Sequence, residues 1–545
     1  MSISSFVEKY PMAVRAFLIV VLTAVFVSLC VQQSRIKGRL CSVPNYDDVV
    51  YLYQGALLQK TVANEGINGF LRFLRETDLH SPFSIFLAAV SFAILGIRDD
   101  APYIANLIVV VGYLAGLTWF FRKLKFFDWL LCAVMFLTLP FMTIGVVEFR
   151  PDIAWAVMAG FGVVWFVTEP AVFSNYSKAA LSGMFLGLAL TIKPTTFAMT
   201  VLLYSGAIIS RAVIGYSTLR ESQSPGTIRI IKGAIIVLIV ACLFAGPYWL
   251  RYGREVWEYF YINSFGVNKA VWSLDMGLFD SITYYITGAG GVSNLGRSGA
   301  ILFLFTLLCA SLAFVRFRQI RLNMVFLMLI LLGACAVNSV ASMKQPFLGG
   351  GFYGVLIFSS AYLIALVYGA NDLGIRARVI LRIVLCFFCA ASIISYAWPD
   401  CSDYFKTRMD SLANLKGSNE FLVRNLKESG SGIPKSILFT QAGPIIMEGV
   451  GLSMLRDNLN PTMRWGAFIR NAEGFRWTYP NFDWVLLQDP GMKGSSPNMP
   501  SEAILPEFQA VIAADPNYKV HAEYIDADGK RIVIYSRIDR NHGAE

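Results

Sequence analysis

Long apolar segments dominate the first 398 residues of the 545-residue chain. A membrane-spanning helix needs roughly 20 apolar residues to cross a hydrocarbon core about 30 Å thick. Ten segments come close to that length: 12–31, 101–121, 127–147, 151–168, 194–213, 232–251, 298–316, 322–343, 346–369 and 379–398. Two shorter apolar segments lie at 82–97 and 179–192. The pattern predicts an α-helical polytopic membrane protein with about 11 to 12 membrane helices.

Positive charge between these segments predicts their orientation, because cytoplasmic loops carry an excess of Lys and Arg. Three short loops have such an excess: Arg211, Arg220, Arg229 and Lys232; Arg316, Arg318 and Arg321; Arg376, Arg378 and Arg382. With these loops and the N-terminus inside, the chain after residue 398 faces outward, as do loops 32–81, 148–152, 252–297 and 344–346. These loop positions are mutually consistent if the chain crosses the membrane eleven times and segment 82–97 is only partial or re-entrant.

The chain changes character after residue 398, where charge density becomes ordinary and strand-like runs appear. Segments 436–440 and 484–488 are typical of buried strands, and 503–514 is typical of a helix. Segments 520–524 and 531–537 flank an Asp528-Gly529 turn and predict a hairpin. We therefore expect a transmembrane domain over 1–398 and a small extracytoplasmic α/β domain over 399–545.

Composition excludes several other classes. Only 15% of the residues are charged, against about 25% in soluble proteins, which argues against a soluble or disordered chain. Net charge is +10, but residues 399–545 have 16 Lys and Arg against 18 Asp and Glu, so an excess of +12 lies in the first 398 residues. That placement orients membrane helices and argues against nucleic acid as a partner.

Acidic residues at two outer positions are candidates for chemistry. Asp47 and Asp48 follow the first span and begin an amphipathic helix. Either one of them caps this helix, or the pair supplies a general base or cation ligand at the membrane surface. Asp152 follows in Glu148-Phe-Arg-Pro-Asp on the same predicted face. Arg150 either pairs with one of these acids at the lipid headgroups or belongs to the site. Whether Asp47 and Asp152 hold a divalent cation stays an open alternative.

Several cations lie on the predicted outer face, where the orientation rule makes them rare. They suit an anionic group such as phosphate or pyrophosphate: Lys193, Lys269, Arg297 and Lys344. The alternative for Lys193 is a snorkelling side chain at the interface. His80 is either a polar loop residue or a substrate contact. No phosphate-binding loop, dinucleotide fingerprint, serine elbow or HExxH motif is present.

The motifs in their order resemble the polyprenyl-phosphate-dependent GT-C glycosyltransferases. The likeness is to the branch of protein mannosyltransferases and bacterial aminoarabinose transferases. It rests on Tyr46-Asp47-Asp48-Val49-Val50-Tyr51, His80-Ser81-Pro82-Phe83, Arg150-Pro151-Asp152, Lys193-Pro194 and the α/β tail. It implies that Asp47 is the catalytic base, Asp48 the acid beside it, Asp152 a second acid near the site and Lys193 the lysine of a later helix pair. His80-Ser81-Pro82 departs from the more usual His-Pro-Pro.

The resemblance implies a transferase in the bacterial inner membrane, with the N-terminus cytoplasmic and the tail periplasmic. We expect Asp47 to deprotonate an acceptor hydroxyl of a glycan, lipid or protein. The hydroxyl then attacks a hexosyl or pentosyl donor and displaces polyprenyl phosphate with inversion, while Lys193 and Lys344 stabilise the leaving charge. Loop 252–297 is expected to cover the site. No cofactor is certain.

A transporter or flippase for a lipid-linked or anionic substrate is the alternative. In it, Asp152 and Lys193 would bind the substrate or an ion within the membrane. The two halves of the chain show no evident repeat. The large outer loop and the tail have no role in alternating access, so a transferase is the better reading.

Overall fold

The computed structural model describes residues 11–37, 40, 47–77, 81–220, 226–274, 276–296, 299–341, 343–368, 375–397, 417–429, 434–440, 445, 447–456, 462–492 and 499–538. The chain forms two compact units. The first comprises Met1–Cys30, Leu74–Ser84 and Tyr103–Ser402, and the second comprises Val31–Phe73, Ile85–Pro102 and Asp403–Glu545. Both units are therefore assembled from segments that are far apart in the sequence.

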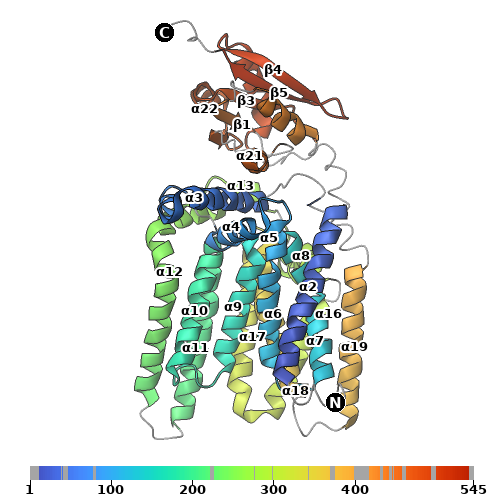
Figure 1. Ribbon diagram of the computed structural model, residues 1–545. Helices are drawn as coiled ribbons and strands as arrows, with labels where there is room; N and C mark the ends of the chain where they lie inside the picture. The colour runs from blue at the N-terminus through green and yellow to red at the C-terminus, as the bar shows by residue number, and fades with distance from the viewer. Residues whose placement is uncertain are drawn as a thin grey trace. The chain divides into compact units, whose positions relative to one another are not determined.

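Four helices near the N-terminus contain residues of both units: α2 (Pro11–Lys37), α3 (Asp47–Glu76), α4 (Pro82–Leu95) and α5 (Ala101–Ala105). The remaining long helices belong to the first unit and many run roughly parallel (Figure 1): α6 (Leu107–Phe121), α7 (Phe126–Leu137), α8 (Pro140–Val147), α9 (Pro151–Thr168), α10 (Tyr176–Ile192), α11 (Phe197–Arg220), α12 (Gly226–Ser264), α16 (Gly299–Arg316), α17 (Arg321–Val340), α18 (Gly350–Tyr368) and α19 (Ile375–Ala397). Short helices connect them: η2 (Pro194–Thr196), α13 (Lys269–Trp272), α14 (Leu278–Thr283), α15 (Ala289–Leu295), η3 (Arg318–Ile320) and η4 (Pro346–Gly349).

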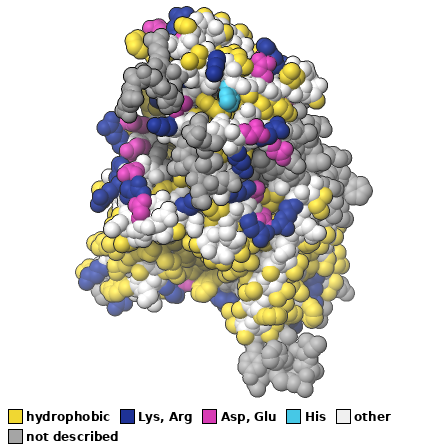
Figure 2. All heavy atoms as spheres, turned by 45° about the horizontal axis from the view of Figure 1, so that its top comes forward, with side chains coloured by type: hydrophobic (Ala, Val, Ile, Leu, Met, Phe, Trp, Pro, Cys, Tyr) yellow, Lys and Arg dark blue, Asp and Glu magenta, His cyan; other side chains and the backbone are white. Residues whose placement is uncertain are grey.

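Among the described residues, eight helices are long and apolar enough to cross a membrane, and α7 with α8 makes a ninth candidate. Shorter apolar helices lie at Pro82–Leu95, Tyr176–Ile192 and Arg382–Ala391. Apolar side chains cover much of the visible surface of the helices, as contact with lipid tails requires (Figure 2). The predicted polytopic helical membrane protein is confirmed.

One predicted span is wrong in detail. Segment 127–147 was expected to be continuous, but α7 and α8 are bent by 57° relative to each other. Pro140 occupies the first turn of α8, and Leu139 before it has an extended backbone at ψ 137°. A proline disfavours helical geometry in the residue that precedes it, so the helix breaks there although the apolar pattern continues.

Helices α9 and α18 form the centre of the first unit. The spans that contain them are 83% and 78% buried, whereas the span in α12 is 22% buried. Gly160 and Gly354 let the two backbones touch, because a Cβ at either position would overlap the other helix. Small residues commonly allow such close approach between membrane helices. The N-terminal end of α9, which carries Asp152, is therefore held by the best-packed part of the unit.

The C-terminal part of the second unit contains a five-stranded sheet in the order β2-β1-β3-β5-β4. Its strands are β1 (Ser436–Phe439), β2 (Thr462–Trp465), β3 (Trp484–Gln488), β4 (Tyr518–Ile525) and β5 (Arg531–Arg537). Strand β1 is parallel to β2 and β3, whereas β5 is antiparallel to β3 and β4. A hydrophobic core lies on each side of the sheet. Helices pack around it: residues 417–428, α21 (Met447–Arg456), α22 (Ala472–Thr478), η6 (Tyr479–Asn481), η7 (Glu502–Ile504) and α23 (Leu505–Ala513).

The predicted small α/β domain is confirmed. Strands β1 and β3, helix α23 and the hairpin of β4 with β5 lie where the sequence places them. Gly529 has φ 76° in the hairpin turn, which explains the preference for glycine after Asp528. Strand β2 and helices α21 and α22 were not predicted.

Candidate active site

The N-terminal end of α9 brings Asp152 into the interior of the first unit. Arg150 precedes the helix with an extended backbone (φ −118°, ψ 146°), and Pro151 occupies the first helical position. Proline suits that position because it has no N–H to leave unpaired. Asp152 follows in the first turn, where the helix dipole favours a negative charge. The residue is only 4% exposed.

Lys193 reaches Asp152 from the end of α10. Its backbone leaves the helix at φ −136°, ψ 83°, immediately before Pro194. Lys193 Nζ forms a hydrogen-bonded ion pair with Asp152 Oδ1, and Lys193 is 9% exposed. The pair joins α9 to the α10–α11 connection. Trp155 Nε1 donates to Thr200 Oγ1 at 2.8 Å and links α9 to α11 one turn further along.

A second ion pair lies beside the first. Arg150 Nε is 3.0 Å from Glu148 Oε2, and both side chains are largely buried. The Arg150 guanidinium carbon lies 4.4 Å from the ring centroid of Phe347, and Lys193 Nζ lies 5.2 Å from the same centroid. Phe347 belongs to η4, just before α18. The aromatic ring therefore contacts two cations whose charges are balanced by two carboxylates, an arrangement in which cation–π attraction is strengthened by burial.

We call Glu148, Arg150, Asp152, Lys193 and Phe347 the charge cluster. The structure brings three sequence-predicted residues together in it, namely Arg150, Asp152 and Lys193. Glu148 was noted only as a partner for Arg150. Phe347 was missed because a phenylalanine at the start of an apolar span carries no signal in the sequence that separates it from a core residue.

Lys344 lies in a different environment. Its ammonium donates to the carbonyl oxygens of Asn338, Ser339 and Ala341 at 2.7, 2.7 and 2.6 Å. A cation at the last carbonyls of α17 complements the helix dipole. Lys344 is 2% exposed, and burial lowers the pKa of its ammonium. The structure thus gives Lys344 a helix-capping contact, and its binding to substrate stays a prediction.

The remaining sequence-predicted candidates differ in how much of them the structure describes. Lys269 is exposed at the start of α13. Asp47 begins α3, and its side chain lies outside the described residues, as do His80 and Arg297. Asp48 is fully buried in the second unit. No group of three or more His, Cys, Asp or Glu in the described part of the chain is placed to hold a metal ion. A cation held by Asp47 and Asp152 therefore stays a prediction.

The fold defines a polytopic helical membrane protein with a C-terminal α/β domain. The chain is similar to the crystal structure of ArnT from Cupriavidus metallidurans in the apo state, with a TM-score of 0.54, 12% identity, and coverage of 94% of this chain and 97% of that one. A second structure of the same protein, bound to undecaprenyl phosphate, gives a TM-score of 0.49, 11% identity and 98% coverage of both chains. No protein-family model and no curated protein sequence matches the chain. At this identity, the first likeness shows the fold.

Proposed function

We propose that this protein is a membrane glycosyltransferase that moves a sugar from a polyprenyl-phosphate-linked donor to an acceptor hydroxyl on the outer face of the membrane. The main support for this proposal is that the structural similarity to ArnT extends over nearly the whole of both chains, including the C-terminal domain. The buried charge cluster supports the same conclusion, because Arg150 and Lys193 both contact the ring of Phe347 near the N-terminal end of the central helix α9. Two such cations suit the phosphate of a lipid-linked donor.

Inverting transfer needs few groups from the protein. The Asp47 carboxylate takes the proton of the acceptor hydroxyl, whose oxygen attacks the anomeric carbon as the bond to the phosphate oxygen breaks. The phosphate leaves with the electron pair and needs no general acid. Lys193 and Arg150 stabilise the leaving charge, and Asp152 holds the Lys193 ammonium in place. Asp48, the acid beside Asp47, is fully buried at the start of α3.

The test is transfer by purified protein in liposomes, supplied with a panel of polyprenyl-phosphate sugars and total envelope acceptors. We expect Asp47→Asn to abolish the release of polyprenyl phosphate, because the amide cannot accept the proton. Glu65→Gln is the matched control, since Glu65 is a partly exposed carboxylate on the same helix that pairs with Arg72. It should retain full activity.

Three results would contradict the proposal. Full activity of Asp47→Asn would contradict the assignment of Asp47 as the base. The unfolding temperature of this variant, compared with that of the wild type, separates loss of the base from loss of the fold. Wild-type protein that consumes no donor in the panel would remove the transferase. Movement of intact donor across the liposome membrane without loss of sugar would favour the flippase instead.

A further inference from the structure

Helix α3, which carries Asp47 and Asp48, is divided at Gly66. This glycine has φ 59° and ψ −138°, values that a helix cannot contain. A break of this kind uncouples the two halves of a helix, because the hydrogen-bond ladder is interrupted. The backbone hydrogen bonds alone therefore do not set the rotation of residues 47–65, although Glu65 and Arg72 pair across the break. Other packing must hold the acidic end of α3 in place.

Part of that packing comes from α4, whose Ala88 lies against Gly55, and part comes from the C-terminal part of the chain. Residues 31–73 and 403–545 belong to the same compact unit. Gly451 of α21 lies against Tyr53 of α3 and Met463 of β2, since a Cβ on Gly451 would stand 2.6 Å from Cε of Met463, 2.6 Å from Cε2 of Tyr53 and 3.0 Å from its Cδ2. Only a residue without a side chain lets the ring lie this close to the backbone of α21.

A second contact joins the same two helices. Lys60 Nζ donates to the carbonyl oxygen of Leu455 in the last turn of α21. Tyr53 and Lys60 are two turns apart on one face of α3, and Gly451 and Leu455 are one turn apart on one face of α21. Contact at two separate heights fixes rotation as well as position. Glu448 lies in the first turn of α21, and burial together with this carboxylate raises the pKa of Tyr53 to about 12, so the phenol stays neutral.

Helix α21 is itself firmly held. Val450 and Met454 are fully buried in the hydrophobic core that includes residues of β1, β3 and β5. Arg456 pairs with Asp99 and also donates from Nε to the carbonyl oxygen of Ile97 at 3.2 Å. One face of α21 is thus packed on the sheet while another contacts α3.

We propose that α21 of the C-terminal domain is a positioning element for the acidic end of α3, acting through Gly451, Tyr53 and Lys60. This inference rests on the proposed function, because it assigns to the tail the task of aiming Asp47. A helix turns by 100° per residue, so a rotated α3 would carry Asp47 away from the acceptor. Displacement of a reacting group by about 1 Å can lower the rate about 100-fold.

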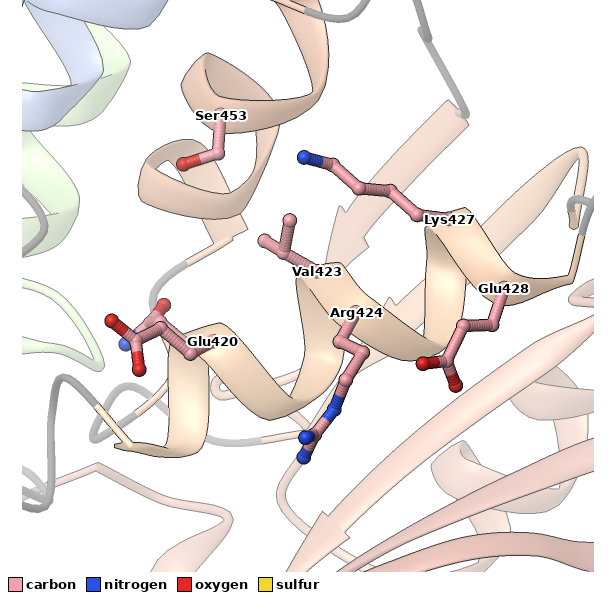
Figure 3. Close-up of a pocket in the computed structure, with 7 residues that line it drawn as sticks. Glu420, Val423, Arg424, Lys427, Glu428 and Ser453 are labelled. Atoms are coloured by element: carbon pink, nitrogen blue, oxygen red, sulfur yellow. The ribbon is translucent and has the colours of Figure 1, made fainter.

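The experiment compares Gly451→Leu with Ser453→Leu in the full-length protein. Ser453 is two residues away on the same helix, so its side chain leaves from nearly the opposite face. It lines a cavity of about 410 Å³ beside helix 417–428, together with Val423, Arg424 and Lys427 (Figure 3). The control leucine has space there, whereas the leucine at 451 meets Tyr53 and Met463.

Hydrogen exchange supplies a measurement that does not need activity. We expect Gly451→Leu to remove protection from the amides of residues 48–60 and to leave those of β3 and β5 unchanged. Ser453→Leu should change neither. The double variant Gly451→Leu/Tyr53→Ala should regain protection in α3, because removal of the ring makes room for the leucine once the flexible end of Met463 moves aside. Lys60→Met is the second variant if Gly451→Leu does not fold, and it should show the same loss in α3.

Donor turnover completes the test. In Gly451→Leu we expect kcat to fall about 100-fold with little change in the donor KM, because the donor still binds while the base is displaced. Part of that loss should return in the double variant. Unchanged exchange in α3 would overturn the positioning contact even if the protein transfers no sugar. Lost protection in α3 with unchanged kcat would overturn its link to catalysis. Absence of transfer by the wild type contradicts the proposed function alone.

Discussion

At the scale of single residues, the buried ion pair between Asp152 and Lys193 is the centre of the charge cluster. Asp152 and Lys193 stand out because charges within apolar segments are costly. Their direct pairing was not predicted, since 41 residues separate them and no local period relates them. The contact of Phe347 with two cations was not predicted for a different reason. Arg150, at the start of α9, and Lys193, at the end of α10, are brought to its ring only by the fold.

The Asp152–Lys193 pair allows structural and catalytic roles to be separated. Removing one member of a buried pair leaves an uncompensated charge and costs about 3–5 kcal/mol. We therefore expect Asp152→Leu and Lys193→Met each to lower the unfolding temperature in detergent. The double variant Asp152→Leu/Lys193→Met should regain most of the stability, because apolar residues of similar volume often replace such a pair without loss.

Activity should not follow stability in that series. The double variant has no ammonium to stabilise the leaving phosphate, so it should remain inactive in the liposome assay while its unfolding temperature returns toward that of the wild type. Recovery of both properties together would show that the pair only holds helices α9 and α10 together.

At the scale of elements, the sequence predicted what local patterns encode. The strands β1 and β3 are continuous apolar runs, and the β4–β5 hairpin has an Asp-Gly turn. Strand β2 was missed because its four residues, two of them exposed, pair only at the edge of the sheet. Helix α21 was missed because Gly449 and Gly451 lower helix propensity, and tertiary packing supplies what the local sequence lacks.

The contact between α9 and α18 gives a prediction for helix packing. A Cβ at Gly354 would overlap the backbone carbonyl of Ala156, which cannot rotate away. We expect Gly354→Val to separate the helices and to reduce the yield of folded protein, measured by size-exclusion chromatography and thermal unfolding. Gly112→Ala in α6 is the control, because no atom lies within 4 Å of its added Cβ. The control should match or exceed wild-type stability, since alanine favours helix by about 1 kcal/mol over glycine. Equal yields of the two variants would contradict the close contact.

At the scale of the whole molecule, composition and contacts divide the chain differently. The boundary predicted at residue 398 follows the change in charge density and stays a prediction. The compact units follow contacts instead, so residues 31–73 and 85–102 join the C-terminal part of the chain. Composition cannot reveal this, because it reports which residues tolerate lipid and not which segments meet. The interleaving also explains why the acidic end of α3 comes under the influence of a distant part of the sequence.

Charge placement gives the last prediction, which concerns orientation in the membrane. The excess of +12 over the first 398 residues lies largely in loops that the positive-inside bias assigns to the cytoplasm. Arg318, in the α16–α17 connection, and Glu473, in α22, are both exposed and serve as reporters on opposite predicted faces. In a variant without native cysteines, Glu473→Cys should react with an impermeant maleimide in intact spheroplasts, whereas Arg318→Cys should react only after permeabilisation.

The reverse pattern would place the charge cluster and the tail with the cytoplasmic pool of nucleotide sugars. A lipid-linked donor would then no longer be required, and the proposed chemistry would lose its physical reason.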